Sequence, residues 1–429
     1  MKKLLLFLIA FSAAFCLFAQ EGTGIMGYLD DPEVESFQNE PRRKIDVGIF
    51  SFNTSIANNI TNATEIFKKD IVIDAGKINN SLGEKDAQSN IMIDVSALQF
   101  NLNIDKRWGL GFGINLNGGL NLLIPKSLFA LLAEGNADND ISKGTFSVYG
   151  GIFYEFGTSS HITLPALDGK LTLGFDPAFF VPVAYIPRKG ISYTLDTSDH
   201  ILLDAKGTFA IYTPVNADST NPASIFSSGG VDFNFSAEYA LVSRLDLGLK
   251  FTHIPLAPSF MRNGYNAGFA TADGKPVMEI QNITDLSNGF SLNSPEVKPG
   301  DYGSLDPITV FRPLRFEAYS LFRPLSGTLS DLMVIKPIIG FTTDFAAEET
   351  FFNGILEIQL HAGHFFPGYL FNLYTSTGIE ENFWRHKIGF EINLRAFELD
   401  FGIGLRSQDF LSSFKAAGVQ VALGIRAGW

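Results

Sequence analysis

The chain has 429 residues, a formal net charge of −13 at pH 7, one cysteine, and equal numbers of phenylalanine and glycine, 41 of each. The acidic balance argues against a nucleic-acid partner, because phosphates are bound by clustered lysine and arginine. With Cys16 as the only cysteine, the rest of the chain has no thiolate metal site and no cysteine nucleophile. Abundant aromatic residues and glycines are typical of β-barrels.

Residues 1–19 predict a cleavable secretory signal. Two lysines precede an apolar run that ends in a small residue, Ala19, as in signal peptides. The run is shorter than the roughly 20 residues that a membrane-spanning helix needs, which disfavours the alternative of an uncleaved anchor. Cys16 suggests a lipoprotein, but Phe15 stands where lipidation needs a small residue. We therefore expect export and cleavage after Ala19.

Residues 20–43 are polar, acidic and interrupted by proline. Two interpretations stay open for this segment, a plug folded into the lumen of a barrel and a disordered leader. No later stretch approaches the length of apolar sequence that a transmembrane helix requires.

From residue 44 onwards, apolar side chains recur at every second position. The pattern is clear in 108–117, 231–251 and 387–406, where the alternate positions hold glycine, asparagine and isolated charges. Alternation shows only that one face of a strand is apolar, so a soluble β-sandwich is one alternative. Strands of about 9–11 residues and small polar residues on the second face favour a membrane barrel. Aromatic residues near strand ends suit an interface girdle: Trp108, Phe112, Tyr154, Tyr239, Tyr374 and Trp384. We predict an all-β chain, a transmembrane antiparallel barrel of about 14 strands over 44–429.

Residues 125–136 predict one short helix between two strands. Pro125 stands at its start, leucines at 128, 131 and 132 have helical spacing, and Gly135 ends it. A helix between two spanning strands belongs in an extracellular loop or in the mouth of the barrel.

Three prolines five residues apart, Pro177, Pro182 and Pro187, interrupt one strand-like stretch. Proline removes a donor from the β-ladder, so a central strand rarely contains it. Either the prolines lie in a loop, or they kink a strand and open a lateral gap between lumen and bilayer.

Residues 255–312 predict a long loop, rich in proline, glycine and asparagine, with one weak strand near 277–283. Loops of this length are usually functional or disordered. Its apolar side chains could line an entry site for an apolar ligand or pack on the barrel rim: Leu256, Phe260, Met261, Tyr265 and Phe269.

The last twelve residues, "GVQVALGIRAGW", alternate to the final tryptophan. We expect them to pair with the first strand near 44–53, with Gln420 and Arg426 facing the lumen. A terminal aromatic residue on such a strand resembles the signal that the barrel-assembly machinery of diderm bacteria reads: Val421, Leu423, Ile425 and Trp429.

Motifs for catalysis and metal binding are weak. The glycines of "GLGFGIN" fall at period two, and no serine stands in a G-x-S-x-G elbow. His361 and His364 would point to opposite faces of a strand. We therefore expect no enzyme, no metal and no cofactor.

The mature chain resembles the FadL-like outer-membrane barrels, the long-chain fatty-acid transporters, and especially divergent members from spirochaetes and Bacteroidetes. The stretch "DDPEVESFQNEP" is similar to the hatch of that family and "IPKSLFALLAEGN" to a recurrent helix. The resemblance implies a hatch that blocks the lumen, a pocket that captures a hydrophobic ligand, and a strand kink that releases it sideways. The residues that carry the hatch resemblance are Asp30, Asp31, Pro32, Asn39 and Pro41.

These expectations combine into a hypothesis: an outer-membrane barrel that passes hydrophobic small molecules such as long-chain fatty acids, with membrane lipid and the ligand as partners. A diffusion porin for polar solutes is the first alternative, because asparagine, glycine and charges would line a wet lumen. A surface adhesin that binds through residues 255–312 is the second.

Overall fold

A computed structural model describes the strands and most connections of the chain. The described residues are 45–60, 75–105, 108–134, 141–164, 170–196, 201–214, 226–270, 278–280, 290–292, 296–299, 305–326, 332–361, 371–394, 396–414 and 417–428. The predicted signal 1–19, the predicted plug 20–43 with its hatch residues, His364 and Trp429 lie outside them.

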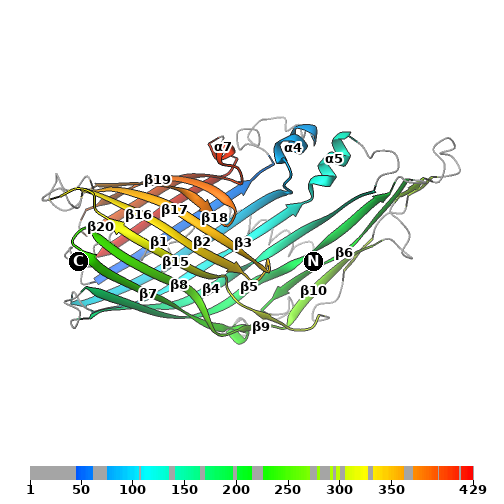
Figure 1. Cartoon of the computed structure of the whole chain (residues 1–429). Coiled ribbons are helices and arrows are strands. Elements are labelled where there is room, and N and C mark those ends of the chain that lie inside the picture. The colour runs from blue at the N-terminus through cyan, green and yellow to red at the C-terminus, as the bar shows by residue number, and fades with distance from the viewer. Residues whose placement is uncertain are drawn as a thin grey trace.

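Within the described residues, fourteen antiparallel strands close into one barrel (Figure 1). The barrel strands, in their order around the wall, are β1 (Ile45–Asn58), β2 (Ala87–Asp105), β3 (Trp108–Ile124), β4 (Ile141–Leu164), β5 (Leu171–Asp196), β7 (Gly230–Val242), β8 (Leu245–Ala257), β15 (Leu314–Phe322), β16 (Met333–Asp344), β17 (Glu349–His361), β18 (Phe371–Glu380), β19 (Phe383–Asn393), β20 (Phe397–Ser407) and β21 (Val419–Gly428). The last strand pairs with the first, from Asp46 opposite Gly428 to Ile56 opposite Val419. The predicted strand number and the predicted closure are therefore confirmed.

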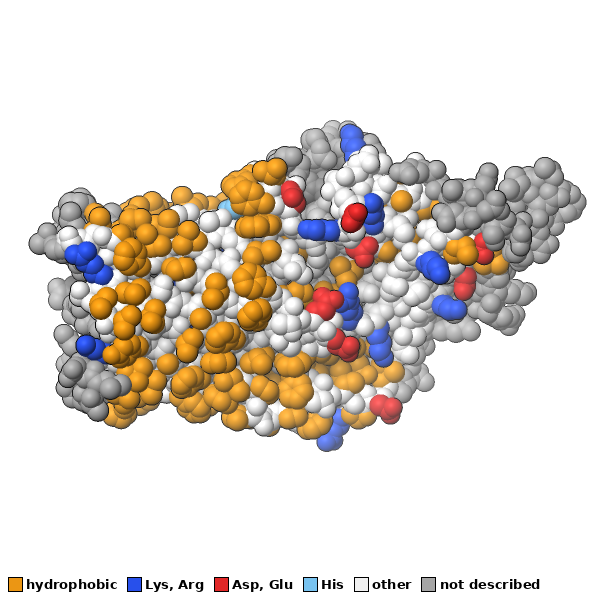
Figure 2. Space-filling model, viewed as in Figure 1, with side chains coloured by type: hydrophobic (Ala, Val, Ile, Leu, Met, Phe, Trp, Pro, Cys, Tyr) orange, Lys and Arg blue, Asp and Glu red, His pale blue; other side chains and the backbone are white. Residues whose placement is uncertain are grey.

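The wall of the barrel is apolar outside and polar inside. On β16, Ile339 and Phe341 are 60% and 51% exposed, whereas Lys336 and Thr342, on the opposite face of the strand, are each 2% exposed. Figure 2 shows apolar side chains over the wall, with charged ones gathered toward the end of the barrel that bears α4 (Ala75–Leu82), α5 (Lys126–Glu134) and β6 (Ile201–Thr213). A soluble sandwich has the opposite arrangement, because its apolar faces form the core. An apolar exterior suits lipid.

Most of the predicted girdle residues face outward. Trp108, Tyr154 and Tyr239 are 50%, 39% and 37% exposed on the outer face. The prediction for Tyr374 is wrong, because this side chain is on the lumen face of β18 and donates a hydrogen bond to Asp400 Oδ1 at 3.0 Å.

A charge placed on the outer face tests this arrangement. Ile339→Arg should make the folded barrel less stable in vesicles by about 2–4 kcal/mol, because the middle of β16 would then carry a cation into hydrocarbon. Urea-dependent folding, followed by tryptophan fluorescence, measures the change. Ile339→Leu is the control and should change little; an arginine variant as stable as the leucine variant would contradict a lipid-facing position.

Both termini of the barrel lie at one end, where most connections are short, and we call this the terminal end. The other end, the mouth end, carries three short helices in the described part of the chain: α4 (Ala75–Leu82), α5 (Lys126–Glu134) and α7 (Phe410–Ser413). Helix α5 confirms the predicted helix. It packs through Phe129 against Ile78 and Leu82 of α4. No helix among the described residues is long and apolar enough to cross a membrane.

Strands β3 and β4 carry glycines on both sides of the middle of their ladder. Gly118 and Gly150 have φ angles of 152° and 147°, a region that residues with a Cβ avoid. A Cβ on Gly118 would meet the backbone oxygen of Gly151, and one on Gly150 would meet that of Gly119. These two positions therefore require glycine.

The segment 255–312 is more regular than predicted. Its described residues hold six short strands instead of one weak strand: β9 (Ser259–Met261), β10 (Asn263–Ala270), β11 (Met278–Ile280), β12 (Phe290–Leu292), β13 (Glu296–Pro299) and β14 (Ile308–Val310). Strand β10 pairs with β13 and with β6 (Ile201–Thr213), which together extend beyond the mouth (Figure 1). Strands β9 and β14 pair only with each other in the described part, as a separate sheet. We call this pair the stem.

Candidate functional site

Strand β5 changes its partner halfway along. Residues 171–180 pair with β7, and pairing with β6 begins at Tyr185. Residues 181–184 belong to neither of these two ladders among the described pairings, while β4 continues on the other side. The barrel wall divides here, because β7 continues the barrel and β6 leaves it.

The three prolines lie in this strand and not in a loop. Pro177 stands opposite Phe233 of β7. Pro182 stands opposite Phe153 of β4, directly beside a register shift, and a second shift brackets Pro187. Bulges of this kind bend a strand and interrupt its pairing. The alternative in which the prolines lie in a loop is therefore wrong, and the kink remains a proposal.

Behind the divided wall, apolar side chains fill the mouth of the lumen. This mouth cluster joins strands β4, β5 and β6 to the stem, to β17 and to the turn before it. All of its members are at most 8% exposed: Tyr149, Phe153, Phe180, Tyr185, Ala210, Tyr212, Met261, Val310, Ala346, Ala347 and Phe351. The rings of Phe153 and Phe180 meet edge to face at 6.0 Å. An apolar core therefore closes a barrel whose other inward residues are largely polar.

The predicted capture residues do not form one surface. Leu256 and Phe260 are 60% and 52% exposed, but Met261 is fully buried in the mouth cluster. Tyr265 is half-buried on β10 opposite Ile211 of β6. The backbone of Phe269 pairs on the same strand, and its side chain lies outside the description. Strand alternation separates Phe260 from Met261 and sends one outward and the other inward.

The turn between β16 and β17 reaches across the mouth to β5. The backbone N–H of Arg188 donates to the carbonyl oxygen of Ala346 at 3.0 Å. Its guanidinium forms an ion pair with Glu349, donates to the carbonyl of Ala347 at 3.4 Å and lies 5.3 Å from the centre of the Tyr149 ring. This turn therefore covers the mouth cluster from the far wall.

Arg312, just after the stem, ties the stem to the inner faces of β4 and β7. Its side chain is fully buried and donates to Asp232 of β7 at 2.8 and 2.6 Å, and to Glu155 of β4. The guanidinium also lies 5.0 Å from the centre of the Phe180 ring. Burial alone would lower the pKa of Arg312, but the carboxylates of Glu155 and Asp232 outweigh it and hold this pKa above its usual value.

His253 completes this buried ion cluster. It has a left-handed φ of 58°, at a register shift between β7 and β8. Its N–H donates to Asn234 Oδ1 at 2.8 Å, and its ring Nε2 is 3.9 Å from Glu155. Sequence reasoning missed the cluster, because its members are 80 and 157 positions apart. The one local signal was an arginine between apolar Phe311 and Pro313.

Beside the mouth cluster, at the turn between β18 and β19, the lumen is lined by paired polar groups. Glu380 accepts from Arg315 at 2.9 Å and Arg385 at 2.8 Å, with Arg406 at 3.8 Å. Among the described residues, no group of histidine, cysteine, aspartate or glutamate could hold a metal ion. This part of the barrel is suited to polar contacts and not to an apolar ligand.

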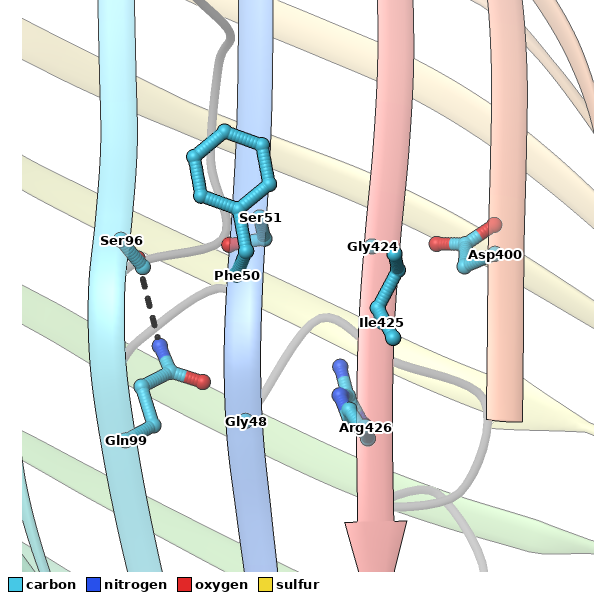
Figure 3. A pocket seen from close by; sticks show the side chains of 9 residues that line it. All are labelled: Gly48, Phe50, Ser51, Ser96, Gln99, Asp400, Gly424, Ile425 and Arg426. Atoms are coloured by element: carbon cyan, nitrogen blue, oxygen red, sulfur yellow. Dashed lines mark hydrogen bonds between the residues drawn. The ribbon is translucent and has the colours of Figure 1, made fainter. Parts of the chain in front are cut away.

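A small cavity lies near the terminal end (Figure 3). Gly48 and Gly424 leave room there, and Ser51, Asp400 and Arg426 line it. Two further residues that line the cavity bind each other: Gln99 Nε2 donates to Ser96 Oγ at 3.4 Å. The cavity is therefore separate from the mouth cluster.

The C-terminal strand has the predicted orientation. Val421, Leu423 and Ile425 alternate with buried Ala422 and Arg426, so the apolar set faces outward. Gln420 faces the lumen, as predicted, and donates to Asn53 Oδ1 at 3.0 Å.

Residues 36–214 match a family of unknown function, DUF5723. The match covers less than half of the chain. No curated protein matches the sequence. Among solved structures, a TodX deltaS2S3 mutant monoaromatic hydrocarbon channel is similar, with 10% identity, a TM-score of 0.47, and coverage of 96% of this chain and 97% of that one.

Two further solved structures are similar over most of their length. The P. putida toluene transporter TodX has 8% identity and a TM-score of 0.45, with 96% of this chain and 95% of that chain covered. The translocator domain of the autotransporter NalP from Neisseria meningitidis has 6% identity and a TM-score of 0.33, with 92% of each chain covered. At these scores, the assignment of function must rest on the residues of this chain.

Proposed function

We propose that this barrel lies in an outer membrane and carries hydrophobic small molecules, such as long-chain fatty acids, from the outside through its mouth. The observation that carries the proposal is the mouth cluster behind the divided part of β5. An apolar molecule that displaces these side chains keeps apolar contacts. The adjacent wall is the part of β5 where neither β6 nor β7 supplies a ladder.

The polar lumen supports sideways release over passage along the barrel axis. An apolar molecule that continued along the barrel axis would have to pass the ion pairs around Glu380. If the wall opened beside residues 181–184, the molecule would pass directly into lipid. Opening the wall costs least where the ladder is already interrupted, since every unpaired backbone group in hydrocarbon is expensive.

The paired arginines at the mouth affect whether a charged or a neutral ligand is favoured. Arg188 and Arg312 lie over aromatic rings of the mouth cluster, and both are already paired with carboxylates. A fatty acid would bring a further carboxylate close to Glu155 and Asp232. We therefore expect a neutral apolar probe to enter at least as well as palmitate, which a competition assay between the two probes measures.

The exposed Phe260 offers a test of capture. Phe260→Asp should weaken the apparent affinity for a fluorescent apolar probe about tenfold, the equivalent of losing about 1.4 kcal/mol of apolar contact. Initial uptake rates into cells that display the protein measure the change. The matched control is Thr309→Asp, because exposed Thr309 stands opposite Phe260 in the stem. It adds the same charge and leaves the aromatic ring, so uptake should change less than about twofold.

Two outcomes would contradict the proposal. Equal loss in both variants would mean that charge near the mouth, and not the ring of Phe260, governs uptake. A large, steady ion current through the unmodified protein in a planar bilayer would instead support the diffusion porin. The apolar outer face of β21 and Trp429 remain our proposed signal for the barrel-assembly machinery.

A further inference from the structure

Helix α7 lies at the rim of the mouth end (Figure 1), and a second aromatic group packs around it on the outside of the barrel. Trp384 and His386 stand on the outward face of β19, and Phe410 and Phe414 come from α7 and its end. The Trp384 and Phe410 rings meet edge to face at 4.9 Å, and the His386 ring stacks on Phe414 at 4.1 Å. We call these four residues, with Leu411, the outer aromatic cluster.

Hydrogen bonds fix this cluster in place. His386 Nε2 is 2.8 Å from Ser413 Oγ, and its Nδ1 is 2.7 Å from Thr377 Oγ1 of β18. Asp409 caps α7 by accepting from the N–H of Ser412 at 2.9 Å. Both ring nitrogens of His386 therefore have partners, and α7 is held against the wall.

The outer aromatic cluster nevertheless leaves large apolar side chains uncovered. Phe410, Leu411 and Phe414 are 41%, 68% and 56% exposed. Directly below them on the outer faces of β19 and β20, Ile388 and Ile403 are 52% and 45% exposed. The apolar surface of the wall thus extends up to α7. Figure 2 shows apolar side chains reaching this part of the rim, with charged side chains beyond it.

We propose that the outer aromatic cluster is a lipid-interface anchor, which inserts α7 into the outer leaflet at the boundary between acyl chains and head groups. Continuity with the lipid-facing wall favours lipid over a second copy of this chain as the occupant. The residue types also fit, since aromatic rings with polar tips prefer this boundary. The anchor fixes how deep the mouth end sits, and it acts independently of the transported molecule.

Spin labelling at Leu411 tests the anchor. Cys16→Ser leaves no other cysteine in the chain, so Leu411→Cys can carry one nitroxide in protein reconstituted into phosphatidylcholine bilayers. Two reference labels bracket the scale: Ile388→Cys on the lipid-facing wall, and Lys143→Cys, which is exposed on the mouth-end part of β4. Relaxation by oxygen, which concentrates in lipid, is compared with relaxation by a water-soluble nickel complex.

We expect the oxygen-to-nickel ratio of the label at 411 to lie near that at 388 and several-fold above that at 143. A ratio equal to that at 143 would overturn the proposal, because the cluster would then face water. Spin–spin broadening that disappears on dilution with unlabelled protein would overturn it too, since a second copy would then cover the cluster.

A pair of variants separates anchoring from correct folding. With the label at 411, Phe410→Ser and Phe414→Ser together should move the ratio toward the water value, whereas Phe410→Leu and Phe414→Leu together should preserve it. Heat-modifiable migration on gels confirms that each barrel has folded. Equal ratios in the serine and leucine pairs would show that the apolar side chains do not set the depth.

Discussion

Replacing Arg312 with methionine is expected to lower the stability of the barrel by about 3–5 kcal/mol. The guanidinium is fully buried between Asp232 and Glu155, which are 2% and 5% exposed in their side chains. Without it, two buried carboxylates lose the cation that compensates their desolvation. The stem also loses its attachment to the β4 and β7 walls. Urea-dependent unfolding in vesicles measures the loss.

Two controls distinguish a buried charge effect from the loss of any arginine at the mouth. Arg188→Met removes an ion pair whose side chains are 33% and 45% exposed, so it should cost about 1 kcal/mol or less. Adding Glu155→Gln and Asp232→Asn to Arg312→Met should restore part of the stability, since no carboxylate is then left unpaired. Equal losses from the two arginine variants would refute the assignment of Arg312 as the main attachment.

Gly150→Ala is expected to prevent most of the barrel from folding. At a φ of 147°, backbone strain alone costs an alanine about 1–3 kcal/mol. The added Cβ would also meet the backbone oxygen of Gly119, on the neighbouring strand. That oxygen belongs to the β3–β4 ladder and cannot retreat without breaking pairs on both sides. The folded fraction in vesicles, read from heat-modifiable migration, measures the effect.

Gly424→Ala is the matched control for that substitution. A Cβ there would lie 3.6 Å from the Cβ of Asp400 and 3.9 Å from that of Ser51, which are ordinary contacts. Gly424 lies at a lumen-facing position of a barrel strand. Because the added Cβ has room there, folding should be nearly unchanged. If both alanine variants folded equally well, close approach of β3 and β4 would not require glycine.

The amino-acid pattern alone determined the local features of the molecule. Period-two alternation identified the strands and their two faces, and the helix at 126–134 followed from a proline, spaced leucines and a glycine. The pairing of the last strand with the first followed as well, because a barrel of antiparallel strands must close on itself. The strands, their faces and the helix depend on neighbours within a few residues, which a single sequence displays directly, whereas the closing pair follows only from the closure of the barrel.

The remaining features were decided by contacts between distant residues. Their apolar character placed Phe260 and Met261 together in one predicted capture loop, but their opposite orientations depend on the stem pairing with Ile308–Val310. The sequence pattern also could not decide whether the three prolines of β5 lie in a loop or in a strand, because the change of strand partner there depends on β6 and β7. Arg312 became the centre of a buried cluster only when β4 and β7 brought Glu155 and Asp232 to it. Pairing across such separations follows from how the barrel closes, and the local order of residues does not encode it.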